Sequence, residues 1–227
     1  MRNLAGFWAP ALAILASVGP VAAADLYVPE PELVVDAPAA PYDWTGFYVG
    51  VIVGYGWADK YAFDEEDDGS YQVEGWLAGI EAGANWQTDM FVLGIEGDVS
   101  WTDMQGDGLI DNDDPIATQI NFLATLTARA GVAWEQALFY VEAGGAWVSE
   151  EHTLTDGGTS DTVSDDRVGG LLGIGLEYAV SENVSLKAEY NYIFLGSKEY
   201  EFDIDGGETI GIEQNLQTFK VGLNYRF

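Results

Sequence analysis

The 227-residue chain lacks cysteine, and it has only 8 lysines and arginines against 38 aspartates and glutamates. Without cysteine there can be no disulfide framework, no thiolate metal site and no cysteine nucleophile. A formal net charge of -30 leaves no basic surface for phosphates, so we expect no nucleic-acid partner. The single histidine also excludes a metal site built from several histidines.

Long apolar runs are scarce as well, because after the first 24 residues none approaches the ~20 residues that a membrane-spanning helix needs. The chain nevertheless has 48% hydrophobic and 13% aromatic residues, together with 28 glycines. An acidic disordered chain would have few aromatic residues, so this composition favours a folded protein. We expect the acidic charge to be segregated from the apolar surface.

The first 24 residues, Met1–Ala24, are predicted to be a secretory signal peptide. A basic start is followed by the apolar stretch Leu4–Val18 and by the small residues Ala22–Ala24, which predict cleavage at that point. A spanning helix is the alternative, but the run is short and contains prolines. Asp25–Asp43 carries four prolines among acids and small residues, which predicts a periplasmic linker without a core of its own.

From residue 44 to 227 the chain has a period of two, as expected of a domain built from strands. A transmembrane strand needs ~9–11 residues, with an apolar face for lipid and a polar or small face for the barrel interior. Eight successive segments fit this description: Trp44–Trp57, Gly75–Trp86, Phe91–Trp101, Gln119–Trp134, Phe139–Ser149, Arg167–Tyr178, Val184–Phe194 and Thr218–Phe227. The predicted fold is all-β, an eight-stranded antiparallel up-and-down transmembrane β-barrel.

The connections alternate between short and long. Short turns are predicted at Gln87–Met90, Glu135–Leu138 and Ala179–Asn183. Long loops are predicted at Ala58–Glu74, Thr102–Thr118, Glu150–Asp166 and Leu195–Gln217. Outer-membrane barrels have short periplasmic turns and longer extracellular loops. We therefore expect a cell outer membrane location in a Gram-negative bacterium, with periplasmic termini and extracellular loops.

Tryptophans support the same interpretation, since the seven that follow the signal peptide all fall near the ends of predicted strands. They are Trp44, Trp57, Trp76, Trp86, Trp101, Trp134 and Trp147. Indole rings favour the membrane–water interface, so two aromatic girdles are expected. A soluble protein would more often bury tryptophan in the middle of a strand.

The phase of the alternation assigns the charged residues to faces. The inward face is predicted to carry Glu81, Glu96, Asp98, Glu142, Glu177 and Glu189 with Arg129, Arg167, Lys187, Lys220 and Arg226. Buried charges cost several kcal/mol each unless paired, and this nearly neutral set allows pairing. The four long loops hold 24 acids and only Lys60 and Lys198, so the surplus acid is expected outside the cell.

Three sequence motifs carry a family resemblance: Ala23-Ala24-Asp25-Leu26, the stretch Asp43–Gly50 and the ending Gly222–Phe227. With them the chain resembles the small surface-antigen barrels of alphaproteobacteria, the porin-family or outer-membrane immunogenic proteins, which are relatives of OmpA-type barrels. The resemblance covers nearly the whole mature chain. It implies roles in envelope integrity, host contact and antigenicity, recognition of the terminal Phe227 by the barrel-assembly machinery, and no catalytic residues.

His152 is the residue to consider for catalysis, because Ser149, Glu150, Glu151 and Thr153 surround it in the sequence. A barrel hydrolase could combine a histidine at the rim with a serine and an acid. We favour an exposed loop histidine over this alternative. No enzyme activity and no catalytic, cofactor-binding or metal-binding residue is predicted.

Acidic loop segments raise the question of calcium. Asp64–Gly69 places acids at the first, third and fifth positions of an EF-hand-like pattern, but the glutamate required at the twelfth position is replaced by Gly75. Asp107–Asp114 and Glu201–Glu208 are also incomplete. Solvated acidic loops are expected, with weak Ca²⁺ or Mg²⁺ binding near lipopolysaccharide phosphates as the open alternative. The glycines of Gly170–Gly175 fit a strand rather than a nucleotide loop.

The sequence thus predicts a structural or surface protein of the outer membrane. It would serve envelope integrity, antigenicity or adhesion through its acidic loops. The alternative is a small porin with a narrow, mostly plugged interior, since eight strands leave room for little more than side chains. The expected partners are outer-membrane lipid, lipopolysaccharide and, during insertion, the assembly machinery, and the expected state is a monomer.

Overall fold

A computed structural model describes residues 42–63, 68–110, 114–156, 159–202 and 208–227. They form a closed antiparallel barrel in which each strand pairs with its sequence neighbour and β1 pairs with β8. The strands are β1 (Gly46–Phe63), β2 (Asp68–Thr88), β3 (Phe91–Ile110), β4 (Asp114–Trp134), β5 (Ala137–Asp156), β6 (Thr159–Ala179), β7 (Val184–Phe202) and β8 (Glu208–Arg226). The predicted fold class is confirmed. Among the described residues there is no helix with the length and hydropathy that a membrane crossing requires.

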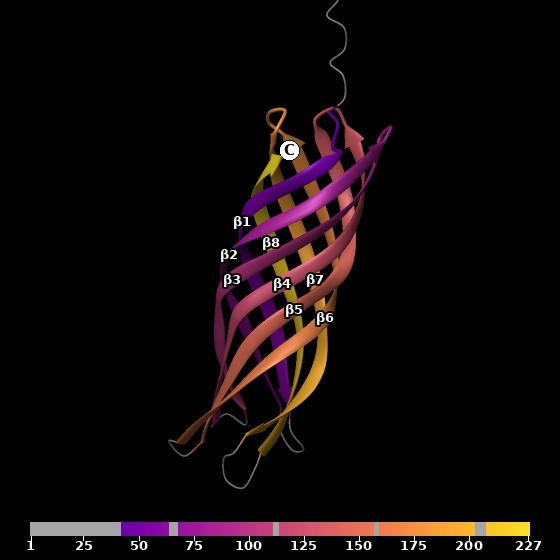
Figure 1. Cartoon of the computed structure of the whole chain (residues 1–227). Coiled ribbons are helices and arrows are strands. Elements are labelled where there is room, and N and C mark those ends of the chain that lie inside the picture. The colour runs from indigo at the N-terminus through magenta and orange to yellow at the C-terminus, as the bar shows by residue number, and fades with distance from the viewer. Residues whose placement is uncertain (1–41, 64–67, 111–113, 157–158, 203–207) are drawn as a thin grey trace, which may run out of the picture. The chain divides into compact units, whose positions relative to one another are not determined.

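Three short turns and Phe227 lie at one end of the barrel, the terminal end, and the long hairpins lie at the other, the far end (Figure 1). Asp89 and Glu135 begin their turns with a φ of 54°, a conformation that non-glycine residues adopt mainly in tight turns. The predicted signal peptide, nearly all of the predicted linker and most of the Asp64–Gly69 motif lie outside the described residues.

Two belts of outward aromatic side chains bound an apolar band on the barrel wall. The terminal belt consists of Phe47, Trp86, Phe91, Trp134, Phe139, Tyr178, Tyr225 and Phe227, and the far belt of Trp57, Trp76, Trp101, Phe122, Trp147, Tyr192 and Phe194. We call the part between the belts the terminal half and the part beyond the far belt the far half. Trp44 was predicted to join a girdle, which is wrong, since its side chain is 0% exposed inside the barrel.

The strands are much longer than predicted, because the segments assigned to long loops are largely strand. β1 and β2 remain paired to Phe63↔Asp68, and β5 and β6 to Asp156↔Thr159. Only residues 64–67, 111–113, 157–158 and 203–207 fall between the strand segments at the far end. The prediction failed because it followed outward apolar residues, and these end at the far belt.

Beyond the far belt the polarity of the wall reverses. On β5 the outward residues change from Val141 and Trp147 to Glu151, whereas the inward residues change from Glu142 to Val148. An outward apolar face suits lipid, and an outward polar face over an apolar interior suits water. The far half is therefore built like a water-soluble barrel that continues from the terminal half.

Most strands keep their alternation through the reversal, but β7 and β4 do not. In β7 both Leu195 and Tyr200 are buried, on either side of a register shift against β8. β4 changes phase in the same way. The register shifts between Ile120 and Phe122 against β5, which leaves Asn121 as an extra residue. A bulge of this kind reverses the inside and outside phase of a strand. The period-two pattern of the predicted segment Gln119–Trp134 places Ile120 on the outward face, which is wrong, because Ile120 is fully buried inside.

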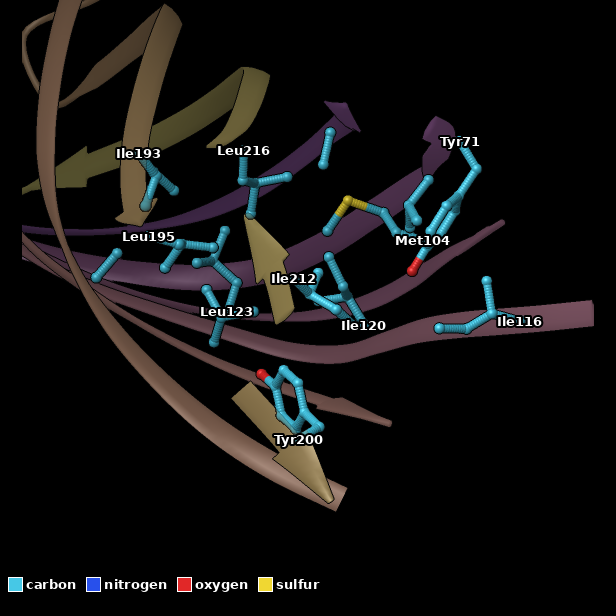
Figure 2. Packing of buried hydrophobic residues seen from close by; sticks show 14 of the residues in the cluster. Tyr71, Met104, Ile116, Ile120, Leu123, Ile193, Leu195, Tyr200, Ile212 and Leu216 are labelled. Atoms are coloured by element: carbon cyan, nitrogen blue, oxygen red, sulfur yellow. The ribbon is translucent and has the colours of Figure 1, made fainter. Parts of the chain in front are cut away.

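The interior of the far half is a packed apolar cluster (Figure 2). Its buried members come from all eight strands, and Leu171 is the buried member from β6. They include Tyr71, Val73, Met104, Ile116, Ile120, Leu123, Val148, Leu154, Leu171, Ile193, Leu195, Tyr200, Ile212 and Leu216. This cluster closes the barrel interior on the far side of the charged layer described next.

Candidate functional site

The interior of the terminal half contains a layer of charges centred on Lys187. Its Nζ lies 2.7 Å from Glu96 Oε1 and 3.3 Å from Glu189 Oε2, and it also donates to Glu81. Nearby, Lys220 Nζ lies 2.7 Å from Asp98 Oδ2. All of the charged residues predicted to face inward are buried, as the period-two pattern indicated. Ion pairing offsets the cost of removing them from water.

Arg129 extends this layer toward the terminal end. Its guanidinium lies 3.1 Å from Glu96 Oε2 and 3.5 Å from Glu177 Oε2, and it stacks between the rings of Tyr48 and Tyr140. Nearer the terminal end, Trp44 packs with Val92, Ala133, Leu138, Tyr140 and Ala179 in a second apolar cluster. Arg226 lies over the Trp44 ring and donates to the Trp44 carbonyl oxygen. The terminal opening is thereby filled by side chains.

Glu96, Glu142 and Glu189 bring one carboxylate oxygen each within 4.8 Å of one another, the spacing of a possible metal site. The Lys187 ammonium, however, already contacts both Glu96 and Glu189. This lysine supplies the positive charge that a cation would bring. We therefore interpret Glu96 and Glu189 as part of the structural ion-pair network, and Glu142 beside them accepts a hydrogen bond from the Thr127 hydroxyl.

A second polar group lies inside the apolar cluster of the far half, centred on Glu150. Lys60 Nζ lies 2.8 Å from Glu150 Oε2, while His152 Nε2 and Arg167 lie 3.3 and 3.5 Å from Oε1. The hydroxyl of Tyr200 donates to the same Oε1 at 3.3 Å. We call these five residues the Glu150 group. Its one carboxylate is surrounded by donors from β1, β5, β6 and β7.

The protonation states of the Glu150 group follow from its burial and its charges. Burial alone would raise the pKa of Glu150, but His152 and Lys60 outweigh it and hold that pKa well below the usual range. Burial lowers the pKa of Lys60 to about 8, with Glu150 offsetting part of the effect. Burial likewise lowers the pKa of His152. Near neutral pH the Glu150 carboxylate is therefore ionised and the His152 imidazole is neutral. Lys60 is mostly protonated and begins to lose its proton just above that pH.

His152 was predicted to be an exposed loop residue, which is wrong, because it is 0% exposed. Its Nδ1 lies 2.8 Å from Thr118 Oγ1, and that hydroxyl also contacts the Tyr71 hydroxyl at 2.8 Å. Ser149, the serine considered for a hydrolase, projects from the opposite face of β5. A hydroxyl, an imidazole and a carboxylate follow one another here, and all three belong to buried residues of the far half.

Of the Glu150 group, Arg167 was predicted to face inward, but Lys60, Glu150, His152 and Tyr200 were missed as interior residues because they lie in segments assigned to loops. A usable signal was present, since Lys60 keeps the inward phase of β1, and Glu150 and His152 keep the inward phase of β5. Alternation therefore continued after the apolar outward residues had ended. The acidic stretch Glu201–Glu208 lies in part outside the described residues. Of the stretch Asp107–Asp114, the first residue is an exposed outward residue of β3.

Comparisons with known proteins agree with this architecture. The sequence profile of the outer membrane protein beta-barrel domain matches residues 11–227. The chain is 36% identical to the 31 kDa outer-membrane immunogenic protein of Brucella melitensis, over 90% of this chain and 92% of that protein. It is 33% identical to the 25 kDa outer-membrane immunogenic protein of the same organism, with 100% of both chains covered.

Among solved structures, the barrel is similar to that of the outer membrane protein OprG from Pseudomonas aeruginosa. The TM-score is 0.54 at 12% sequence identity, covering 82% of this chain and 98% of that chain. At this identity the likeness concerns the fold.

Proposed function

Because the chain belongs to the outer membrane β-barrel protein family, we propose that it is a surface protein of the outer membrane that presents its far half outside the cell. There it would support envelope integrity, act as an antigen or mediate adhesion. The observation that carries the proposal is the reversed polarity of the far half, whose outward acids and buried apolar cluster suit water rather than lipid.

This arrangement favours a surface role over the alternative of a small porin. The interior is filled in succession by the cluster around Trp44, the charges around Lys187 and the far apolar cluster. Conduction would have to displace all three. Planar-bilayer recordings of the purified protein should show no reproducible open events, and truncation of Arg129 or Glu142 should not create them. Openings that change with either truncation would support the porin.

The relatives named above are described as immunogenic outer-membrane proteins rather than as enzymes, which supports a non-enzymatic role. We further propose that the outward acids lie close to lipopolysaccharide phosphates with divalent cations between them, and that the exposed terminal Phe227 is read by the assembly machinery. Periplasmic termini follow from the family pattern of short periplasmic turns.

The orientation can be tested directly because the chain has no cysteine of its own. We would introduce Ser197→Cys at an exposed far-half position and, as the matched control, Glu182→Cys in an exposed turn at the terminal end. A membrane-impermeant maleimide should label the first variant in intact cells and the second only after lysis. The reverse pattern would contradict the proposal. A deletion strain complemented with either variant would then report detergent sensitivity and surface adhesion.

A further inference from the structure

The backbone pairing of neighbouring strands stops short of the far end at two places among the described residues. One is between β2 and β3, beyond Glu74↔Gln105, and the other is between β6 and β7. Their paired register extends from Ala179↔Ser185 only to Gly170↔Phe194. Beyond it, β6 remains paired with β5 as far as Thr159, and β7 remains paired with β8 as far as Phe202. In Figure 1 the hairpins β5–β6 and β7–β8 diverge toward the far end. We call this unpaired stretch, with β6 residues 159–169 on one side and β7 residues 195–202 on the other, the seam.

The seam begins at a bulge in β7. The register against β8 shifts between Phe194 and Gly196, and Gly196 has a φ of 67°, a left-handed conformation that suits glycine. A Cβ atom added at Gly196 or at Gly170 would meet nothing within 4 Å. Both glycines are exposed, and the paired register of β6 and β7 ends beside them.

Side chains replace the missing backbone pairing across the seam. The Arg167 guanidinium donates to the carbonyl oxygens of Leu195 and Gly196, at 3.1 and 2.5 Å. Lys198 Nζ lies 2.6 Å from Asp165 Oδ2, and the Tyr200 hydroxyl donates to the same oxygen at 3.1 Å. Arg167 and Tyr200 also contact Glu150, so the side chains that bridge the seam are held from the barrel interior by the Glu150 group.

The backbone of β6 leaves a definite set of groups facing the seam. Ala179 N–H donates to the Gln136 carbonyl on the β5 side, and the β5–β6 register continues from there without a bulge. The backbone N–H and C=O groups of odd-numbered β6 residues therefore point toward β5. Those of the even-numbered residues from 168 down to 160 point toward the seam. One of these, the Thr162 N–H, donates to the side chain of its neighbour Asp161 at 3.0 Å.

Unpaired edges of this kind accept extended peptides as an additional strand. We infer that the β6 edge of the seam is a docking site for an extended cationic peptide segment. This inference rests on the proposed surface role and specifies a class of partner for it. Charge selects the occupant, because Asp161, Asp165 and Asp166 lie along the β6 edge and Glu199 is an exposed residue of β7 next to Lys198. A second copy of this acidic chain would bring like charges to the same edge.

The side-chain pattern on β6 specifies the peptide further. Asp161, Val163 and Asp165 share one face, and all three are half-buried, whereas their inward neighbours on β5 are fully buried. A docked strand places its side chains opposite these positions on the same face. The matching segment therefore carries cations four residues apart with an apolar residue midway between them. One cation takes the position at Asp165 that Lys198, with a side chain 46% exposed, now occupies.

The test uses the whole mature protein in detergent micelles and a fluorescent peptide of about ten residues. The peptide has threonine spacers, two lysines four positions apart and a valine between them. We expect saturable binding by fluorescence anisotropy, protection of the seam-facing β6 amides in hydrogen–deuterium exchange, and loss of affinity with added salt. A matched peptide with glutamates in place of the lysines should not bind. Equal binding of the two peptides, or protection confined to other strands, would overturn the inference.

Ser164→Pro removes one N–H that faces the seam and leaves the pairing with β5 intact. Ser164→Ala is its control, because both variants lose the 3.4 Å contact of the Ser164 hydroxyl with Glu151. We expect the proline variant to bind the lysine peptide about tenfold more weakly than the alanine variant. Equal affinities would show that binding does not use the β6 backbone.

If Ser164→Pro fails to assemble, the backbone contribution can be tested on the unaltered protein with a lysine peptide N-methylated at alternate residues. Methylation on one of the two alternating sets of amides should abolish binding, and methylation on the other should have little effect. Insensitivity to both would overturn the inference. These measurements need no particular orientation in the cell. Their failure would thus leave the maleimide test of the surface role unaffected, and failure of the maleimide test would not alter peptide binding.

Discussion

The terminal and far halves of the barrel share the same strands but have opposite polarity, with an apolar outer face in the first and an apolar interior in the second. In the terminal half, Leu126 faces outward between the aromatic belts and Lys187 faces inward among carboxylates. In the far half, Gln119 faces outward and Ile120 faces inward, a few residues along the same β4. Period two therefore sets which residues share a face, and the surrounding solvent decides which face is apolar.

The two interiors differ in how they are held together. The terminal half depends on a network in which Lys187, Arg129 and Lys220 each contact more than one acid. Lys187, for example, contacts Glu81, Glu96 and Glu189. The far half depends on apolar packing around the single carboxylate of Glu150. Breaking a buried network leaves charges without partners, whereas the far half contains few buried charges that could lose a partner. Substitutions should therefore have different consequences in the two regions.

The largest effect is expected from Lys187→Met, which removes the central cation of the terminal half. Three buried carboxylates would lose a partner, and breaking such a buried pair costs about 3–5 kcal/mol. Urea titration of folding into lipid vesicles, read by the heat-dependent gel shift, would measure the loss. Lys198→Met is the matched control, because its pair with Asp165 is partly exposed and such pairs contribute about 0–1 kcal/mol. Equal losses in the two variants would refute the network interpretation.

A smaller effect tests the polarity reversal on a single strand. Leu126 is 69% exposed toward the apolar band, so Leu126→Arg should cost about 2–4 kcal/mol in lipid vesicles. Gln119→Arg, on the outward face of the far half, should change the folding free energy by less than about 0.5 kcal/mol. The same vesicle titration compares them. A comparable cost at both positions would mean that the apolar environment extends over the far half.

The smallest effect concerns pH and should be confined to the far half. Burial lowers the pKa of His152, so near pH 6.5 this residue binds a proton in the unfolded chain but not in the folded chain. The free energy of unfolding therefore decreases as the pH falls below that value. Glu150, whose folded pKa lies below its usual 4.5, adds a second loss as the pH falls through 4.5 and below. Hydrogen exchange of far-half amides, corrected for intrinsic rates, should be about two- to tenfold faster at about pH 5 than at about pH 7.5.

His152→Gln should remove the part of this pH dependence that begins near pH 6.5, because glutamine does not titrate. A wild-type far half that is equally protected at both pH values would show that neither group is linked to stability. If the His152→Gln variant kept the full response, the dependence would have to come from Glu150 or from residues elsewhere.

Much of the terminal half could be predicted from sequence because lipid imposes a strict rule on it. Val49, Val51 and Val53 alternate with small or polar residues, which fixed the strand, its faces and the inward position of charges such as Glu81. The family relationship was also predicted from short motifs, and the sequence profile match confirmed it. Trp44 escaped the rule, since an aromatic residue at a strand end suits either an interface or a plug.

The far half could not be predicted in the same way. Its outward face meets water, so residues such as Asp59 and Glu151 resemble loop residues in composition, and the strands beneath them were assigned as loops. His152 was placed in the solvent for that reason. Only strand pairing across the barrel brings Lys60, ninety residues away in sequence, to Glu150 and buries both.

By itself, then, the sequence determined an exported acidic chain with eight alternating segments, their order and the faces that lipid must cover. The tertiary structure decided how far each strand continues, where a bulge at Asn121 reverses the phase of β4, and where β6 parts from β7. The physical reason is that alternation is a local property of the chain, written into neighbouring residues. Burial in the far half, by contrast, depends on strands that meet only when the barrel closes.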